Sequence, residues 1–287
     1  MAAYQIITDS GCDLPAWKLA ELDVISTPLF VRFRGEDRPD CVDDSIKEIY
    51  DGLRAGESAT TAAINPAGWE AIIEPVLQGG KDALVLTFSS GLSTTYQSAV
   101  IAAAELEEKY PDRKVCVVDS LCASLGQGLL VYHTAKMRDA GMKLEELAAW
   151  VSEKRYNLCH WFTVDDLMCL KRGGRISAAT AMVGTMLQIK PILQVDQEGH
   201  LINTAKTRGR KASIQALADK AVQTALPGEN DVMFICHGDC LEDAQYLAQL
   251  MKERCGAKEV FIGYTGAVIG SHSGPGTLAL FYLGTHR

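Results

Sequence analysis

Short, mainly apolar runs that end in small polar residues recur through the first half of the chain. Tyr4–Thr8, Ala83–Phe88 and Val115–Val118 are three such runs, and each is followed by an Asp-Ser or Ser-Ser pair. Runs of this length without regular polar alternation are typical of strands buried on both faces of a parallel sheet. We therefore predict three buried strands in this half.

Each of these runs is followed by a stretch with helical periodicity, most clearly after the second and third runs. Residues 94–109 and 125–140 carry apolar side chains at spacings of three and four, which predicts helices. Strands that alternate with helices indicate a parallel α/β sheet. Ligands of such sheets lie beyond the carboxyl ends of the strands, and those ends are rich in Thr, Asp and Ser here.

The pattern changes after about Leu158. Residues 190–195 and 201–205 flank the turn sequence Asp-Gln-Glu-Gly-His, which predicts a β-hairpin. Further helices are expected at 211–225 and 242–255, and further strands at 232–236, 260–264 and 277–283. We expect residues 1–157 to form a parallel α/β domain and residues 158–287 an α+β domain. The span 28–60 is the least regular part of the first half.

Length and charge narrow the classes of function. A chain of 287 residues is long enough for two domains with a sizeable core. Its net charge of −8 disfavours nucleic acid and anionic membrane surfaces as partners. No run of 18 apolar residues predicts a membrane-spanning helix.

The beginning of the chain and its cysteines favour a cytoplasmic protein. MAAYQIITDS lacks the basic and apolar regions of a secretory signal. Nine cysteines without a C-x-x-C pair predict reduced thiols. The closest pairs, Cys116 with Cys122 and Cys236 with Cys240, are weak zinc candidates, and buried spectator thiols are the preferred interpretation.

A hydroxyl-rich segment joins the second predicted strand to its helix. It reads Thr87-Phe-Ser-Ser-Gly-Leu-Ser-Thr-Thr-Tyr-Gln-Ser98, with Ser93 or Thr94 at the expected N-cap. Free backbone N–H groups and the helix dipole favour an anion at such a place. Simple capping of the helix explains the same residues, so the pattern alone leaves both interpretations open.

Two cationic loops stand out in this acidic chain. Leu170-Lys-Arg-Gly-Gly-Arg-Ile-Ser177 and Lys206-Thr-Arg-Gly-Arg-Lys211 place basic residues around glycines. Guanidinium groups in such loops suit a phosphate group or an acidic partner. Solvated surface loops are the alternative.

A glycine-rich segment near the end of the sequence contains a histidine. Residues 263–276 hold five glycines, and His272 lies among them. Glycines at this density indicate close backbone approach or left-handed turns, which leaves the histidine room to face a ligand. A structural histidine is the alternative, and His237 is a weaker candidate because it only closes a strand.

Many ordered motifs give the chain a resemblance to the DegV family over essentially its whole length. The motifs are Thr8-Asp-Ser10, Thr60-Thr61, Ser89-Ser-Gly-Leu-Ser93, Tyr96-Gln-Ser98, Asp119-Ser120, Lys171-Arg-Gly-Gly-Arg-Ile176, Ile189-Lys-Pro-Ile192, Arg208-Gly-Arg-Lys211 and Gly266-Ala-Val-Ile-Gly-Ser-His-Ser-Gly-Pro-Gly276. The resemblance implies a two-domain DegV-like fold, with the ligand between the domains.

The resemblance also implies a function. Bacterial family members bind a single long-chain fatty acid and present its carboxylate to a separate ATP-dependent kinase, which forms the acyl phosphate. By this resemblance the protein is a non-catalytic carrier without a cofactor or metal. Its expected partners are the fatty acid and the kinase, with no nucleic acid and no stable membrane insertion.

The same resemblance implies the ligand-binding residues. Thr61, Ser93 and His272 match the positions that hold the carboxylate, and the adjacent hydroxyls Thr94 and Ser271 are expected beside them. The residues expected to face the phosphate group or the kinase are Arg175, Arg208, Lys171 and Arg172. Replacement of Arg175 or Arg208 is expected to spare fatty-acid affinity.

The chain departs from the family pattern at the head-group turn. Where the family commonly continues Thr-Ser-Gln-Pro, this sequence has Thr61-Ala-Ala-Ile64, and Thr94 replaces a usual glycine. Ala62, Ala63 and Ile64 therefore bear on head-group contacts and on the preferred chain length.

Two other classes of function compete with the carrier. One is a binding protein for another small carboxylate or phosphate, which the fold alone permits. The other is a serine hydrolase with Ser93 as nucleophile, His272 as base and Asp239 or Asp119 as the orienting acid. No G-x-S-x-G sequence surrounds Ser93, which disfavours the hydrolase.

Overall fold

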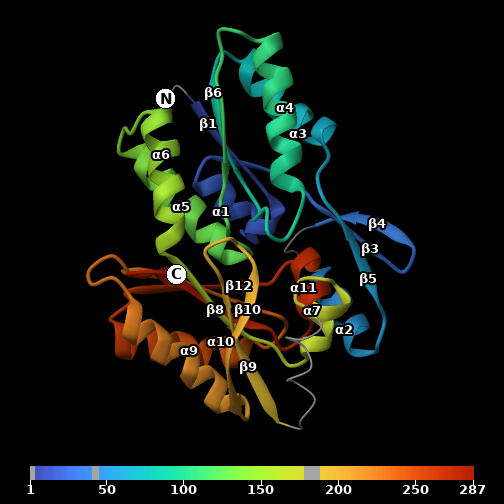
Figure 1. Cartoon of the computed structure of the whole chain (residues 1–287), viewed down its shortest axis with the longest axis vertical. Coiled ribbons are helices and arrows are strands. Elements are labelled where there is room, and N and C mark those ends of the chain that lie inside the picture. The colour runs from blue at the N-terminus through green and yellow to red at the C-terminus, as the bar shows by residue number, and fades with distance from the viewer. Residues whose placement is uncertain (1–3, 41–44, 178–187) are drawn as a thin grey trace.

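The computed structural model describes residues 4–40, 45–177 and 188–287, and its strands form three sheets (Figure 1). The first sheet contains β1 (Tyr4–Asp9), β2 (Val24–Thr27), β6 (Asp82–Thr87) and β7 (Val115–Asp119). The second contains β8 (Leu158–Thr163), β9 (Ile189–Val195), β10 (Leu201–Arg208), β11 (Val232–His237), β12 (Glu259–Tyr264) and β13 (Leu278–Leu283). The third contains β3 (Phe30–Phe33), β4 (Glu36–Pro39) and β5 (Ala59–Ala62).

Ten α-helices are found within the described residues. They are α1 (Ala16–Glu21), α2 (Ile46–Arg54), α3 (Pro66–Gln78), α4 (Thr95–Lys109), α5 (Leu125–Asp139), α6 (Leu144–Lys154), α7 (Leu167–Arg172), α9 (Arg210–Thr224), α10 (Leu241–Cys255) and α11 (Ala267–Ser273). None of the helices in this part of the chain is long and apolar enough to cross a bilayer.

The first sheet is parallel throughout, in the order β2-β1-β6-β7. All six residues of β1 are buried, as expected for a strand covered on both faces. Helices α3 and α4 pack together on one side, and α5 and α6 lie on the other (Figure 1). The predicted alternation of strands and helices is confirmed.

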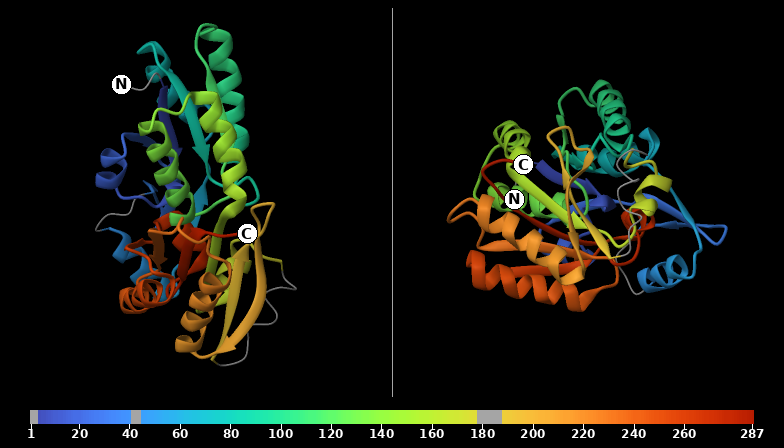
Figure 2. Two further views of the ribbon diagram at one scale, coloured as in Figure 1. Left: turned by 90° about the vertical axis from the view of Figure 1, so that its left-hand side faces the viewer. Right: turned by 60° about the horizontal axis from the view of Figure 1, so that its bottom comes forward.

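The second sheet is mixed, in the order β10-β9-β8-β13-β11-β12. The predicted hairpin is present as β9 and β10, and Asp196 shapes its turn by accepting the N–H groups of Glu198 and His200. β13 lies in the interior of the sheet, antiparallel to both β8 and β11. Figure 2 shows α9 and α10 side by side on one face. The mixed α/β architecture with a second sheet matches the prediction.

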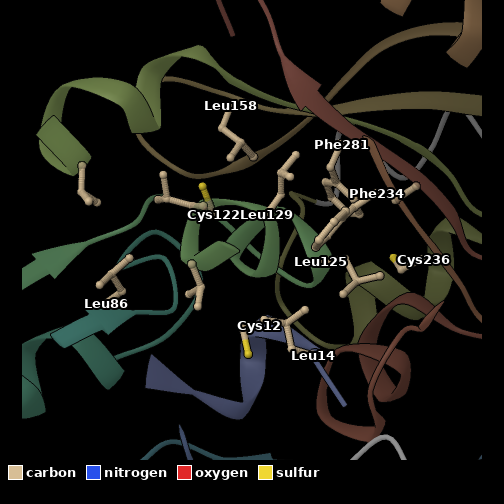
Figure 3. Packing of buried hydrophobic residues seen from close by; sticks show 14 of the residues in the cluster. Cys12, Leu14, Leu86, Cys122, Leu125, Leu129, Leu158, Phe234, Cys236 and Phe281 are labelled. Carbon is tan, nitrogen blue, oxygen red and sulfur yellow. The ribbon is translucent and has the colours of Figure 1, made fainter. Parts of the chain in front are cut away.

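Helix α5 fills the space between the two large sheets. Its side chains Leu125 and Leu129 are fully buried and belong to the same apolar cluster as Leu86 of the first sheet and Phe234 and Phe281 of the second (Figure 3). Burial of one such side chain stabilises the fold by about 1.5–3 kcal/mol. The two sheets are therefore joined through one continuous core.

Strands β3, β4 and β5 and helix α2 form a unit that the hydrophobic pattern does not reveal. The sheet β4-β3-β5 and helix α2 pack against α11, which lies far along the sequence (Figure 1). The Tyr50 hydroxyl donates to the Thr265 carbonyl at 2.7 Å, and the Arg54 guanidinium pairs with Asp239. The second sheet begins at Leu158, while the domain boundary near Asn157 stays a prediction.

Candidate functional site

A cavity of about 500 Å³ lies between the first sheet's strand-end loops and one face of the second sheet. Its volume is within the usual range for a small-molecule site. The lining is mainly apolar, and the larger apolar side chains in it are Leu29, Phe88, Leu92, Phe162, Leu170, Val195, Leu201, Val268, Ile269 and Phe281. Such a lining suits a hydrocarbon ligand.

Two predicted head-group residues meet at this cavity. The Thr61 Oγ1 and His272 Nε2 atoms lie 2.8 Å apart, although 211 residues separate them in the sequence. β5 supplies Thr61 and α11 supplies His272, so the contact depends on the packing of the third sheet against α11. A hydroxyl and an imidazole are thus placed together at the cavity wall.

The imidazole of His272 is held close to the turn that follows α7. A Cβ atom at Gly173 would clash with the ring, so glycine permits this approach. Burial, with a smaller effect from the Arg175 charge, lowers the pKa of His272 to about 4. The ring is therefore neutral at pH 7, and a carboxylate placed beside it would raise this pKa.

Helix α4 begins at the cavity. Ser93, Thr94 and Gln97 line the wall, and the Ser93 Oγ atom lies 2.8 Å from Thr95 Oγ1 and accepts from the Thr95 N–H. Thr94 is the N-cap residue but makes no capping hydrogen bond with its side chain. The dipole of this 15-residue helix favours an anion at its first turn.

Arg175 also lines the cavity and connects its two sides. Its guanidinium donates to the Leu92 carbonyl at 3.2 Å and to the Gly173 carbonyl. Leu92 directly precedes Ser93, and Gly173 contacts His272. A half-buried cation therefore lies next to the residues expected to hold the carboxylate.

The other predicted residues lie away from the cavity wall. The Ser271 hydroxyl donates to the Ala267 carbonyl within α11 at 2.6 Å. Arg172 donates to the Cys169 Sγ atom, while Lys171 stands beside it at the end of α7. Arg208 ends β10. None of these four residues is among those that line the cavity.

Sequence reasoning did not single out several residues of the wall. Gln97 projects from the first turn of α4, and Thr265, Ser273 and Thr277 belong to or flank the glycine-rich segment. Gln97, Thr265 and Ser273 lie within the segments quoted as motifs, and Thr277 directly follows the last of them, which is the signal that could have found them. Ala62 and Ala63 line the wall beside Thr61.

The described contacts do not assemble the serine hydrolase alternative. His272 bonds to Thr61, and Ser93 bonds to Thr95. Asp239 pairs with Arg54, whereas Asp119 accepts the N–H groups of Ser90 and Leu121. A nucleophile and its base need to lie within hydrogen-bond reach. Among the described residues, no three or more His, Cys, Asp or Glu side chains form a group that could hold a metal.

Fold and cavity together define a mixed α/β protein with two large sheets, one small sheet and a mainly apolar cavity whose wall also carries hydroxyl, imidazole and guanidinium groups. The sequence model of the DegV family matches residues 3–285, so the chain belongs to the DegV family. A DegV domain-containing protein from Clostridium perfringens is 42% identical over 99% of this chain and 98% of its own length.

Solved structures share the whole fold. A DegV family protein from Thermus thermophilus, described with its fatty-acid binding, has a TM-score of 0.86 and 31% identity and covers 99% of this chain and 100% of its own. The fatty acid kinase B3 protein of Streptococcus pneumoniae, loaded with linoleic acid, has a TM-score of 0.85 and 25% identity, with 99% of each chain covered.

Proposed function

We propose that the protein binds one long-chain fatty acid, with the hydrocarbon tail in the cavity and the carboxylate at Thr61, Ser93 and His272. The observation that carries this proposal is a 500 Å³ cavity whose apolar lining meets a hydroxyl, an imidazole and a helix N-terminus. Related structures described with bound fatty acids support it.

The tail supplies most of the affinity. An acyl chain of about 16 carbons gains on the order of 10 kcal/mol on burial, before the cost of ordering, at about 0.8 kcal/mol per methylene. The carboxylate loses its water on entry and needs replacement donors. The Thr61 and Ser93 hydroxyls and the α4 N-terminus supply them, and the Arg175 charge lowers the electrostatic cost of burying the anion.

The protein is then a carrier whose chemistry belongs to a partner. The carboxylate is presented to an ATP-dependent kinase, and Arg175 and Arg208 interact with the kinase or the transferred phosphoryl group, with Lys171 and Arg172 in the same role. Arg175 reaches the cavity, whereas Arg208 lies at the end of β10, which supports a wholly external role for Arg208. A cytoplasmic location, where ATP is available, is part of this proposal.

Ligand extraction from protein purified from cells tests the first step. We expect one intact fatty acid per chain by mass spectrometry after organic extraction. Absence of lipid from folded protein, together with no binding of added long-chain fatty acid at micromolar concentration, would contradict the proposal. A polar metabolite would favour the small-carboxylate alternative, and turnover of an ester the hydrolase.

A reconstituted phosphotransfer assay tests the second step. The loaded protein, a fatty acid kinase and ATP are expected to yield acyl phosphate, and omission of either protein is expected to abolish it. Acyl-phosphate formation by this protein and ATP alone would make it an enzyme and overturn the carrier role.

A further inference from the structure

One strand of the second sheet forms a continuous side of the cavity. Thr277, at its beginning, and Ala279 and Phe281 within β13 all line the cavity. Alternate residues of a strand point to the same face, so these side chains form one row. From Thr277 to Phe281 this row is about 13 Å long at 3.3 Å per residue.

The row of Thr277, Ala279 and Phe281 starts beside the end of α11, the helix that carries His272. The Thr277 hydroxyl donates to the Gly274 carbonyl at 2.7 Å, and Gly274 follows α11 directly after His272 and Ser273. β13 then leads away from α11. Phe281 is therefore the member of the row farthest along the strand from the head-group residues.

Phe281 meets a second aromatic ring at this end. His160 of β8 stands opposite Phe281 in the antiparallel register, and the two rings meet edge to face with centroids 5.2 Å apart. Both residues line the cavity. The two rings form an aromatic wall at this end of the row.

The His160 ring is fixed in place by the backbone. Its Nδ1 atom lies 3.0 Å from the Leu158 carbonyl and carries the proton, while Nε2 accepts from the Ala123 N–H at 3.3 Å. Burial, followed by the Arg287 charge, holds the pKa of His160 well below its usual value. The ring is neutral, and neither nitrogen is left for a ligand.

The first turn of α5 closes the wall from behind. A Cβ atom at Gly126 would clash with the His160 ring and lie 2.8 Å from Cδ1 of Phe281. The rings therefore have no room to move toward the helix. A closely packed interior of this kind resists the addition of even one methylene.

We propose that Phe281 and His160 form the stop for the methyl end of the acyl chain and so set the longest fatty acid that the cavity takes, with the small Ala279 keeping the path to this stop open. This inference rests on the proposed function. It assigns chain-length selection to three residues of the second sheet, apart from the residues that hold the carboxylate.

Two substitutions test the stop from opposite sides. Phe281→Leu removes part of the wall and is expected to move the preferred length to longer chains. Ala279→Leu places a larger side chain in the path and is expected to move it to shorter ones. Each methylene that no longer fits costs about fourfold in affinity. The measurement is the dissociation constant of delipidated protein for saturated fatty acids from dodecanoic to eicosanoic acid.

Leu280→Val is the matched control. Leu280 is buried on the opposite face of β13, in the cluster that includes Leu217 and Met233, so this variant changes stability without touching the cavity. Its length preference is expected to equal that of the wild type.

The outcomes separate this inference from the proposed function. Folded variants that bind fatty acids with an unchanged length preference overturn the stop, and if Phe281→Leu does not fold, Ala279→Leu alone decides. A wild type that binds none of the fatty acids overturns the carrier function itself.

Discussion

The two ends of the cavity each carry a histidine, yet the surroundings give these residues opposite properties. His160 is 1% exposed, and the backbone engages both of its ring nitrogens. His272 is only partly buried, and its described hydrogen bond is to the Thr61 hydroxyl, which a ligand can replace. The comparison shows that the partners of an imidazole, more than its place in a cavity wall, decide whether it can serve a ligand.

The largest expected effect is that of His160→Ala on the stability of the protein. His160→Ala leaves the Ala123 N–H without its acceptor and creates a cavity, so we expect a loss of about 3–5 kcal/mol in the free energy of unfolding. His272→Ala is expected to cost about 1 kcal/mol, because its ring is only partly buried and its described side-chain hydrogen bond is to one hydroxyl. Urea denaturation of the ligand-free protein measures the loss of stability in both variants. Equal losses would show that the two histidines do not differ in their structural role.

The next effect is on head-group recognition. Ser93→Ala removes one donor to a buried carboxylate, worth about 1.5–3 kcal/mol, so fatty-acid affinity is expected to fall roughly tenfold to a hundredfold. The methyl ester lacks the charge and is expected to lose much less. Titrations of both ligands with wild type, Ser93→Ala and His272→Ala test this, and equal losses for acid and ester would mean that these residues only shape the pocket.

A third effect concerns the attachment of the helix that carries His272. Asp40 accepts the Val268 N–H in the first turn of α11 and the Ser10 hydroxyl, and burial raises its pKa above the usual range. The folded state therefore binds this proton more tightly than the unfolded state. The stabilisation is complete below the unfolded pKa of about 4 and is lost as pH rises through the folded pKa.

Asp40→Asn keeps an acceptor for Val268 and removes the charge. As pH rises from 4 to 7, the wild type is expected to lose about 2 kcal/mol more of its free energy of unfolding than this variant does. The reason is that each unit of pKa shift at Asp40 is linked to about 1.4 kcal/mol of stability, and the variant has no carboxyl group there. Thermal unfolding at intervals across that range provides the measurement. Parallel pH profiles would show that Asp40 does not titrate there.

The smallest expected effect is that of Arg208→Ala on lipid binding. Arg208 does not line the cavity, so fatty-acid affinity is expected to change less than about twofold, while acyl-phosphate formation with the kinase decreases. Matched assays of lipid affinity and phosphotransfer test this. Lost lipid affinity with normal phosphotransfer per bound lipid would reverse the assignment.

The strands and helices of the two large sheets could be predicted because their burial leaves a clear pattern. β1, β6 and β7 are short apolar runs, and the helix predicted at 94–109 begins at Thr95. The strands of the third sheet are four residues long, and β5 alternates between half-buried and exposed positions. Their partner is α11, more than 200 residues away, so local periodicity does not reveal them.

The candidate site was predictable only in part, because contacts between distant segments leave no local pattern in the sequence. The family motifs point to Thr61 and His272, and the structure places them in contact. No local pattern distinguishes Arg175, which lines the cavity, from Arg172, which does not. Likewise, nothing near Phe281 or His160 in the sequence marks them as one wall, because β-sheet register alone brings them together.

The interior position of β13 has a consequence for the order of folding. β8 pairs with β13 along its whole length, but Leu278 is translated 120 residues after Leu158. At a synthesis rate of about 5–20 residues per second, β13 is synthesised roughly 6–24 s after β8. An unpaired strand edge promotes aggregation, and α5, which is synthesised before β8 and packs against it, is the element placed to protect β8 during that interval.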